Sequence, residues 1–552
     1  MVKKFFSRGM FGVFALVLAA AWPAAAAEWQ FAVDVPGTKV HALLWIPPAC
    51  ERVRGILLGQ QVILEDKFLE DPIIRAVGTK ECLAFVLMNR GAYGEFNYDP
   101  QAPAEKRDDL LLQRALDLLA ADSGYAELAT APLLPFGHSG AAIAAWHIGY
   151  WNPKRTIAIL TLHAAAIQAP YWDAKANVDG VPVLALTGQY ESWGNPNVPL
   201  DMHWRWLRAG LLEMRASQQR ALMSMLVDPG AGHFSLNEPV TKYIAMFLEA
   251  AVEERVPASA DGDKPITLRT IPLESGWLTD ETPLEVGPNE HPAAPYKLYT
   301  GDRSLAFWHL NKELALANDN FRRDQRGKKM QMVTCAQDGH PLPAQWLIPM
   351  KFEPEADGQT VKLDASFLTE TPPTAAGGGQ PLGHAPGPIE MSLIGGWSGG
   401  NEQVGPRSFR VLPGALGQND TLIVLAYHSG NEEYEYTEAA CEVTFPKMET
   451  SGAPQTVQFA AIADRAAGVS RIPLQAAATS GLPVEFYVVR GPAEVKGAML
   501  ELSVPPPRAR YPVRVTVVAF QRGYPGKWQS APAVEQTFLL TEIRQKSTRD
   551  AP

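Results

Sequence analysis

The stretch Pro135-Phe136-Gly137-His138-Ser139-Gly140-Ala141 decides how the first half of this chain is interpreted. An apolar run from Ala131 to Leu134 precedes it, and an alanine- and isoleucine-rich helical pattern follows it. A strand, a sharp turn that carries a serine and then a helix are the arrangement that exposes a nucleophile. Such a turn is crowded, and Gly137 and Ala141 supply the small residues it needs on either side. We therefore predict that Ser139 is a nucleophile.

The partners of Ser139 carry more weight than the motif, because a chain of 552 residues should match Gly-x-Ser-x-Ala about once by chance. Serine needs a base to take its proton, and the base needs an orienting acid. Glu191 follows an apolar run that ends at Thr187, and His233 follows one that ends at Val227. Each lies at the carboxyl end of its own predicted strand, where a parallel sheet gathers its active site. Asp228 is the alternative acid.

Short apolar strands alternate with helices over residues 28–255, which predicts an α/β fold whose parallel sheet is covered on both faces. The predicted strands and helices are Gly55–Gly59, Lys67–Val77, Leu83–Met88, Arg107–Ala121, Thr156–Leu162, Val181–Thr187, Met202–Gln218, Ala221–Val227 and Val240–Glu253.

The order serine, acid, histidine resembles that of the α/β-hydrolase superfamily, and so does the run Gly230-Ala231-Gly232-His233-Phe234 before a final helix. The resemblance covers residues 28–255. It implies a doubly wound sheet and a serine esterase without a cofactor. Ser139 would attack an ester carbonyl, His233 would take and return the proton, and Glu191 would orient His233.

The resemblance also implies an oxyanion hole. The backbone N–H of Gly140, directly after the nucleophile, is one expected donor. The other should follow Gly59, where the family often has His-Gly and this chain has Gln60-Gln61. Both glutamines stay candidates. Tyr190 and Trp193 flank Glu191, and we expect them to bind substrate.

The first 27 residues are typical of a secretory signal peptide. Lys3, Lys4 and Arg8 precede an apolar run, and Ala25 to Ala27 provide small residues for cleavage. The apolar run is too short to span a bilayer, so we expect a secreted or periplasmic protein without membrane insertion. The formal charge of −10 would become −13 after cleavage, which argues against nucleic acid as a partner.

The four cysteines permit two disulfides in an exported protein. We predict the pairs Cys50–Cys82 and Cys335–Cys441, because each pair lies within one proposed domain; four free buried thiols are the alternative. The histidines of the second half lack metal-ligand spacing, so no metal site is predicted.

The second half of the chain changes character. Residues 256–264 have the composition of a linker, and residues 265–450 predict a β-rich middle module with one helix, Ser304–Leu316. Residues 455–541 resemble a bacterial immunoglobulin-like repeat, on the runs Thr479-Ser480-Gly481-Leu482-Pro483-Val484 and Val488-Val489-Arg490-Gly491-Pro492-Ala493. Residues 542–552 form a tail.

Together these features predict a secreted serine esterase that forms an acyl-enzyme. The accessory module favours an ester on a carbohydrate as the substrate, by analogy. An exported peptidase or amidase of the same fold is one alternative. A catalytically inactive binding or scaffold protein is the other.

Overall fold

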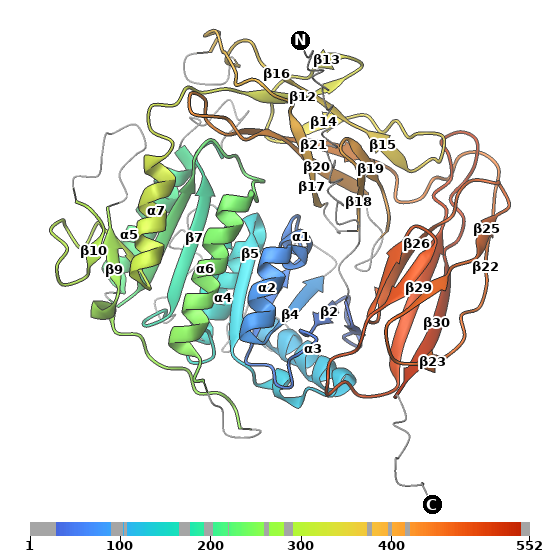
Figure 1. Ribbon diagram of the computed structural model, residues 1–552, viewed down its shortest axis with the longest axis horizontal. Helices are drawn as coiled ribbons and strands as arrows, with labels where there is room; N and C mark the ends of the chain where they lie inside the picture. Colours follow the sequence, from blue (N-terminus) through green and yellow to red (C-terminus); the bar gives the residue numbers. More distant parts are fainter. Residues whose placement is uncertain are drawn as a thin grey trace, which may run out of the picture.

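The computed structural model describes residues 29–89, 103, 107–164, 177–191, 202–218, 220–258, 264–280, 291–372, 378–395, 400–413 and 420–542. The predicted signal peptide, Trp193, most of the linker and nearly all of the tail lie outside these residues. Figure 1 shows an α/β domain, a β-rich part above it and a further β-rich part at one side. In the described part of the chain, no helix combines the length and the apolar character needed to cross a bilayer.

The α/β domain is built on an eight-stranded sheet of order β1-β2-β4-β3-β5-β6-β7-β8. β2 is antiparallel to both of its neighbours, β1 and β4. The strands β4, β3, β5, β6, β7 and β8 are all parallel to one another. The strands are β1 (Phe31–Asp34), β2 (His41–Trp45), β3 (Gly55–Gln60), β4 (Leu83–Asn89), β5 (Leu133–His138), β6 (Ile159–Leu162), β7 (Pro182–Gly188) and β8 (Leu222–Asp228). The predicted α/β class is confirmed for this domain.

Helices cover both faces of this sheet. α1 (Glu65–Glu70), α2 (Pro72–Glu81) and α6 (Glu238–Arg255) share one core with Leu57. α3 (Asp108–Ser123) and α4 (Ala142–Trp151) pack on the other face with Ile56 and Leu58, and α5 (Met202–Ser217) continues that layer over β7 and β8. The alternation of Ile56, Leu57 and Leu58 between two cores explains why this strand is wholly apolar.

The predicted helix Lys67–Val77 is two helices. Asp71 has extended backbone (φ −58°, ψ 129°), and its side chain accepts hydrogen bonds from the N–H groups of Ile73 and Ile74 at the start of α2. Pro72 occupies the first helical position, which suits its fixed φ and missing N–H. The break is therefore a capped helix start.

The segment after α6 still belongs to the α/β domain, to which it adds a small sheet and one helix. β9 (Trp277–Thr279), β10 (Ala294–Pro295) and β11 (Phe307–His309) form a small sheet, and α7 (Lys312–Arg323) packs near α6 and β8. Ile271, Leu278 and Trp308 belong to the main core of the domain. The predicted helix Ser304–Leu316 was wrong in its first half, where Phe307–His309 pairs with β9 as a strand.

A second β-rich part follows, which we call the cap module (residues 333–444). Its three sheets have the orders β13-β12-β16, β14-β21-β20-β17 and β15-β19-β18. The strands are β12 (Val333–Gln337), β13 (His340–Pro341), β14 (Ile348–Met350), β15 (Thr360–Lys362), β16 (Asp364–Phe367), β17 (Glu390–Gly395), β18 (Glu402–Gly405), β19 (Ser408–Arg410), β20 (Thr421–His428) and β21 (Thr437–Thr444). The Cys335–Cys441 disulfide joins β12 to β21, and Cys50–Cys82 is also present.

The C-terminal part is a further set of β-sheets of orders β23-β30-β29-β26, β24-β28-β27 and β22-β25. The strands are β22 (Val457–Phe459), β23 (Arg465–Ala466), β24 (Ser470–Pro473), β25 (Ala476–Ala478), β26 (Glu485–Arg490), β27 (Ala493–Lys496), β28 (Met499–Leu502), β29 (Val513–Phe520) and β30 (Val534–Thr541). Two of its arginines form ion pairs with the α/β domain, Arg490 with Asp122 and Arg508 with Glu127. The β-rich character is as predicted, and the relation to an immunoglobulin-like repeat stays a prediction.

Candidate active site

The turn after β5 places Ser139 at the carboxyl edge of the sheet. Ser139 opens a short 3-10 turn (Ser139–Ala141) that leads directly into α4, and it has a positive φ of 52°. A Cβ on Gly137 would lie 2.3 Å from the carbonyl oxygen of Ala141, so only glycine fits there. Positive φ is strained for a residue with a side chain and persists where the surrounding structure enforces it. The strand-turn-helix geometry that the motif predicts is present.

His233 and Glu191 complete a hydrogen-bonded chain from Ser139. His233 Nε2 lies 2.9 Å from Ser139 Oγ, and His233 Nδ1 lies 2.5 Å from Glu191 Oε2. The three residues come from separate elements, because Glu191 follows β7 and His233 follows β8. A Cβ on Gly188 would lie 2.3 Å from the carbonyl oxygen of Gly232, which shows how closely these two loops pack.

Glu191 is fully enclosed and multiply hydrogen-bonded. Its Oε1 accepts from the backbone N–H of Gly188 (2.7 Å) and the hydroxyl of Thr187 (3.0 Å), and its side chain is 1% exposed. Burial alone would raise the pKa of Glu191, but the charges and hydrogen bonds of His233 and His163 hold it well below its usual range. An ionised Glu191 requires a proton on His233 Nδ1, which leaves Nε2 free to accept the proton of Ser139.

A second histidine contacts the same carboxylate. His163 directly follows β6, has a φ of 48° and is 1% exposed. Its Nδ1 lies 2.7 Å from Glu191 Oε1, and its Nε2 lies 2.8 Å from the backbone carbonyl oxygen of Ser235. Glu191 thus lies between two imidazoles.

The alternative acid, Asp228, is not the partner of His233. Its Oδ2 accepts from Ser235 Oγ (3.0 Å) and Asn237 Nδ2 (2.6 Å), at the start of α6. Burial raises the pKa of Asp228 to about 7, and the nearby carboxylate of Glu438 adds to the rise. The structure therefore places Glu191, and not Asp228, against His233.

His138, which the sequence places next to the serine, is a packing residue. Its Nε2 lies 2.8 Å from the backbone carbonyl oxygen of His233, and it is buried. Burial, with the charges of His233 and His163, lowers the pKa of His138 well below its usual value. The side chain is therefore neutral and donates through Nε2.

Gln61 was a wrong candidate for the oxyanion hole. Its backbone N–H donates to the carbonyl oxygen of Met88, and its side-chain amide donates to the carbonyl oxygen of Ile63 and to Asp66. Its three N–H groups therefore all donate to acceptors within the protein. Gln60 is half-buried at the end of β3, and the pairing of Gly59 with Phe136 brings it beside Gly137.

A buried glutamate that sequence reasoning missed connects this loop to the serine turn. Glu65 Oε2 accepts from the N–H groups of Val62 (2.8 Å) and Ile63 (3.0 Å), and Glu65 Oε1 accepts from that of His138 (2.8 Å). Burial raises the pKa of Glu65 to about 7. It is the buried first residue of α1, and nothing in its local sequence distinguishes it from an ordinary N-terminal acid.

The cap module contributes residues at the triad. The Trp346 ring centroid lies 5.0 Å from that of His233 and 5.1 Å from that of Phe234, and Trp346 is 37% exposed. Glu438 Oε1 accepts from the N–H of Gly232 (2.8 Å), and Glu438 Oε2 accepts from the Tyr436 hydroxyl (2.7 Å). Residues of the cap module, as well as those of the α/β domain, thus hold the loop that carries His233. More than a hundred residues separate His233 from Trp346, so no local sequence pattern could have revealed this contact.

Tyr190 is turned toward the cap module. Its hydroxyl donates to Glu435 Oε2 at 3.2 Å, and its backbone N–H donates to the carbonyl oxygen of Ala231. Substrate binding by Tyr190 stays a prediction, as it does for Trp193, which lies outside the described residues.

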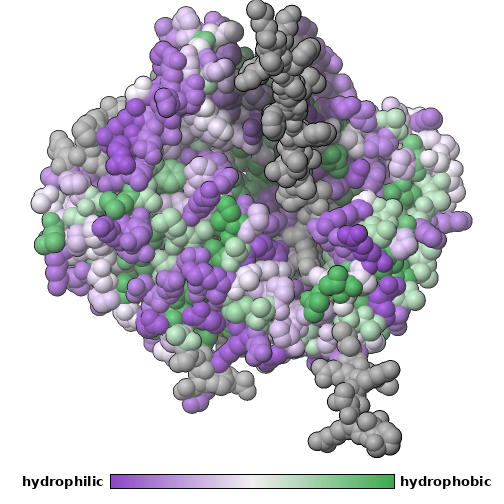
Figure 2. Space-filling model, viewed as in Figure 1, coloured by the Kyte–Doolittle hydropathy of each residue, from purple (hydrophilic) through white to green (hydrophobic). Residues whose placement is uncertain are grey.

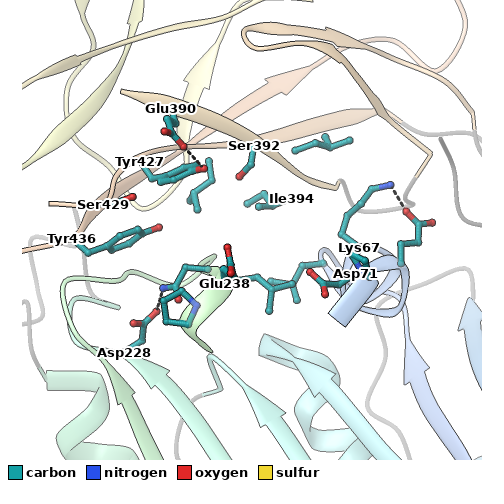
Figure 3. A pocket seen from close by; sticks show the side chains of 18 of the residues that line it. Lys67, Asp71, Asp228, Glu238, Glu390, Ser392, Ile394, Tyr427, Ser429 and Tyr436 are labelled. Atoms are coloured by element: carbon teal, nitrogen blue, oxygen red, sulfur yellow. Dashed lines mark hydrogen bonds and ion pairs between the residues drawn. The ribbon is translucent and has the colours of Figure 1, made fainter. Parts of the chain in front are cut away.

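A cavity of about 1340 Å³ lies between the α/β domain and the cap module. Figure 3 shows Asp228, Glu238 and Lys67 on one side and Glu390 and Tyr427 on the other. Among the residues that the structure describes, the basic side chains at this cavity are Lys67 and Arg75. The acidic ones are more numerous: Glu70, Asp71, Asp228, Glu238, Asp324, Glu390, Glu402 and Glu494. Figure 2 shows a hollow below the upper part of the molecule, with both hydrophilic and hydrophobic residues around it. Among the described residues, no group of His, Cys, Asp and Glu is arranged to hold a metal ion.

The sequence matches no known family model and no curated protein. Similar solved structures include LpqC, a poly(3-hydroxybutyrate) depolymerase from Bordetella parapertussis, with 14% identity over 42% of this chain and 93% of that chain and a TM-score of 0.29. Dienelactone hydrolase from Anabaena variabilis is 18% identical over 41% and 97% (TM-score 0.27). S-formylglutathione hydrolase from Agrobacterium tumefaciens is 13% identical over 40% and 92% (TM-score 0.28).

Proposed function

We propose that the protein is a serine hydrolase that cleaves carboxylic esters through an acyl-enzyme. The observation that supports this most directly is the continuous chain from Ser139 Oγ to His233 (2.9 Å) and on to Glu191 (2.5 Å). Ser139 is partly exposed, while Glu191 is buried, as a nucleophile and an orienting acid must be.

The geometry supports the following sequence of steps. Ser139 Oγ attacks the ester carbonyl carbon while its proton passes to His233 Nε2. The C–O bond to the alcohol then breaks, and His233 gives the proton to the leaving oxygen. A water molecule attacks the acyl-enzyme by the same route and releases the acid and Ser139. Glu191 stays ionised and stabilises the imidazolium form of His233.

The negative oxygen of each tetrahedral intermediate needs donors. The N–H of Gly140 lies in the turn before α4, where the positive end of the helix dipole adds to the effect. We assign the second donor to Gln60, which is the remaining candidate at the end of β3.

We propose an ester on a neutral carbohydrate, in the periplasm or outside the cell, as the substrate. A half-exposed tryptophan beside the catalytic histidine offers a face on which a sugar ring can stack. The carboxylates around the neighbouring cavity disfavour acidic polysaccharides, because like charges repel in such a space.

A fluorophosphonate probe tests the nucleophile. It should label the wild-type protein, and Ser139→Ala should abolish labelling and reduce ester hydrolysis by about 10³-fold or more. Acetylated oligosaccharides should be hydrolysed faster than peptide amides, which separates an esterase from a peptidase. Undiminished labelling of Ser139→Ala would contradict the assignment, and absence of any labelling would favour the inactive scaffold.

A further inference from the structure

His163 lies outside the hydrogen-bonded chain of Ser139, His233 and Glu191, yet its backbone has the same unusual conformation as that of Ser139. Both residues directly follow a central strand, and both have a positive φ, 48° and 52° respectively. Such backbone is costly for a residue with a side chain. An outlier beside a reactive site indicates a function for the residue that bears it.

The hydrogen bonds of His163 fix its protonation state. A backbone carbonyl oxygen can only accept, so the Nε2 that lies 2.8 Å from the carbonyl of Ser235 must carry a proton. An ionised carboxylate can also only accept, so the Nδ1 that lies 2.7 Å from Glu191 must carry one as well. An imidazole with protons on both nitrogens is a cation.

The charges around His163 agree with this state. Burial opposes the cation, but the charge and hydrogen bond of Glu191 raise the pKa of His163 above its usual value, and Glu438 and Asp228 add to the rise. The two other nearby rings are His138 and His233, with centroids 6.0 and 6.3 Å away. His138 is held neutral, as described above.

We propose that His163 is a protonated positioning residue that holds the carboxylate of Glu191 and extends the activity of the triad to acidic pH. This inference rests on the proposed serine hydrolase function. His233 acts as a base only when it is neutral. The positive charge of His163, whose ring centroid lies 6.3 Å from that of His233, partly offsets the negative charge of Glu191 at the base.

His163→Asn tests the charge with little change in shape. The Asn Nδ2 lies where His Nδ1 lies and can still donate to Glu191, and asparagine tolerates left-handed backbone. We expect the acid limb of the kcat/KM profile for a small ester to move upward by about one pH unit or more. His138→Gln is the matched control, because it replaces a neutral histidine whose ring lies even closer to that of His233 (4.9 Å between centroids) and should not move that limb.

Parallel profiles for His163→Asn and wild type, with the same loss at every pH, would contradict the proposal and leave His163 a packing residue. NMR of the ring nitrogens, in protein with isotope-labelled histidine, reports the protonation state of His163 and does not depend on catalytic activity. The signal that disappears in His163→Asn should show two ring protons at pH 8. One ring proton would also overturn the proposal. Absence of hydrolysis and labelling in the wild type would refute the proposed function while this spectrum still decides the charge.

Discussion

The position of single hydrogen atoms decides whether Ser139 can be activated. Three donors converge on Glu191 Oε1, from Gly188, Thr187 and His163, while Oε2 alone receives the proton of His233 Nδ1. The carboxylate therefore imposes one tautomer on His233. Asp228 is a second buried acid near this site, so a substitution of Asp228 can serve as the control for a substitution of Glu191.

Glu191→Gln should reduce kcat by about 10³- to 10⁴-fold with little effect on folding. The three donors will draw the amide oxygen to the position of Oε1, and the NH2 group will then face His233. The histidine must accept there, so its own proton moves to Nε2 and it can no longer take one from Ser139. The measurement is steady-state hydrolysis of a small ester, with circular dichroism as the check on folding.

Asp228→Asn is the control for this change, because Asp228 bonds to Ser235 and Asn237 and not to His233. It should change kcat by less than about tenfold. An equal loss in both variants would mean that the acid side of the site works through the whole buried cluster.

Sequence reasoning found Ser139, Glu191 and His233 because each follows its own strand. His163 obeys the same rule after β6, but a lone histidine at a strand end carries no further signal. Gln61 was misjudged because the sequence does not show where an N–H donates, and here the donor is already bound to Met88.

At the scale of elements, the link between β3, α1 and the serine turn depends on one buried carboxyl group. Glu65 connects Val62 and Ile63 of the loop to His138 at the end of β5. The sequence predicted the strands on either side because their apolar runs are continuous. It could not predict Glu65, since burial of an acid depends on donors from separate elements.

Glu65 should lower the free energy of unfolding as the pH rises from about 4.5 to 7. Its pKa is raised to about 7 in the folded protein, so the folded state binds the proton more tightly than the unfolded state. Its stabilising contribution is complete below the usual glutamate pKa and is lost as the pH passes 7. Asp66, with a pKa raised to about 6, acts in the same direction.

Glu65→Gln should be less stable than wild type at every pH, because the backbone N–H groups lose an acceptor, and its slope should be smaller. Glu65 can contribute up to about 3 kcal/mol across this range. Urea unfolding at pH 4.5, 6 and 8 measures the slope, with the exposed Glu274→Gln as the control for loss of one carboxylate. An unchanged slope in Glu65→Gln would show that Glu65 is ionised throughout.

At the scale of the whole molecule, the cap module packs directly against the loops of the candidate active site. A Cβ on Gly230 would lie 2.1 Å from the carbonyl oxygen of Tyr436, and one on Gly395 would lie 2.2 Å from that of Ile63. The module thus meets the His233 loop and the β3–α1 loop at backbone distance. The Cys335–Cys441 disulfide lies on β21, the strand that also carries Glu438. The sequence predicted this disulfide and a separate β-rich module, but contacts between distant segments left no local pattern from which to predict the shared site.

Trp346 is where this shared architecture should affect substrate choice. Its ring lies beside His233 and Phe234 and is partly exposed, so it can stack on a sugar or an aromatic acyl group next to the reacting ester. Trp346→Ala should raise KM for an acetylated oligosaccharide by about three- to tenfold, the effect of losing one stacking contact. KM for a small alkyl acetate, which has no ring to stack on Trp346, should change less. Trp346→Phe should restore part of the lost affinity. Equal losses for both substrates would instead show that Trp346 supports the position of His233, and the substrate contacts would then have to come from other residues.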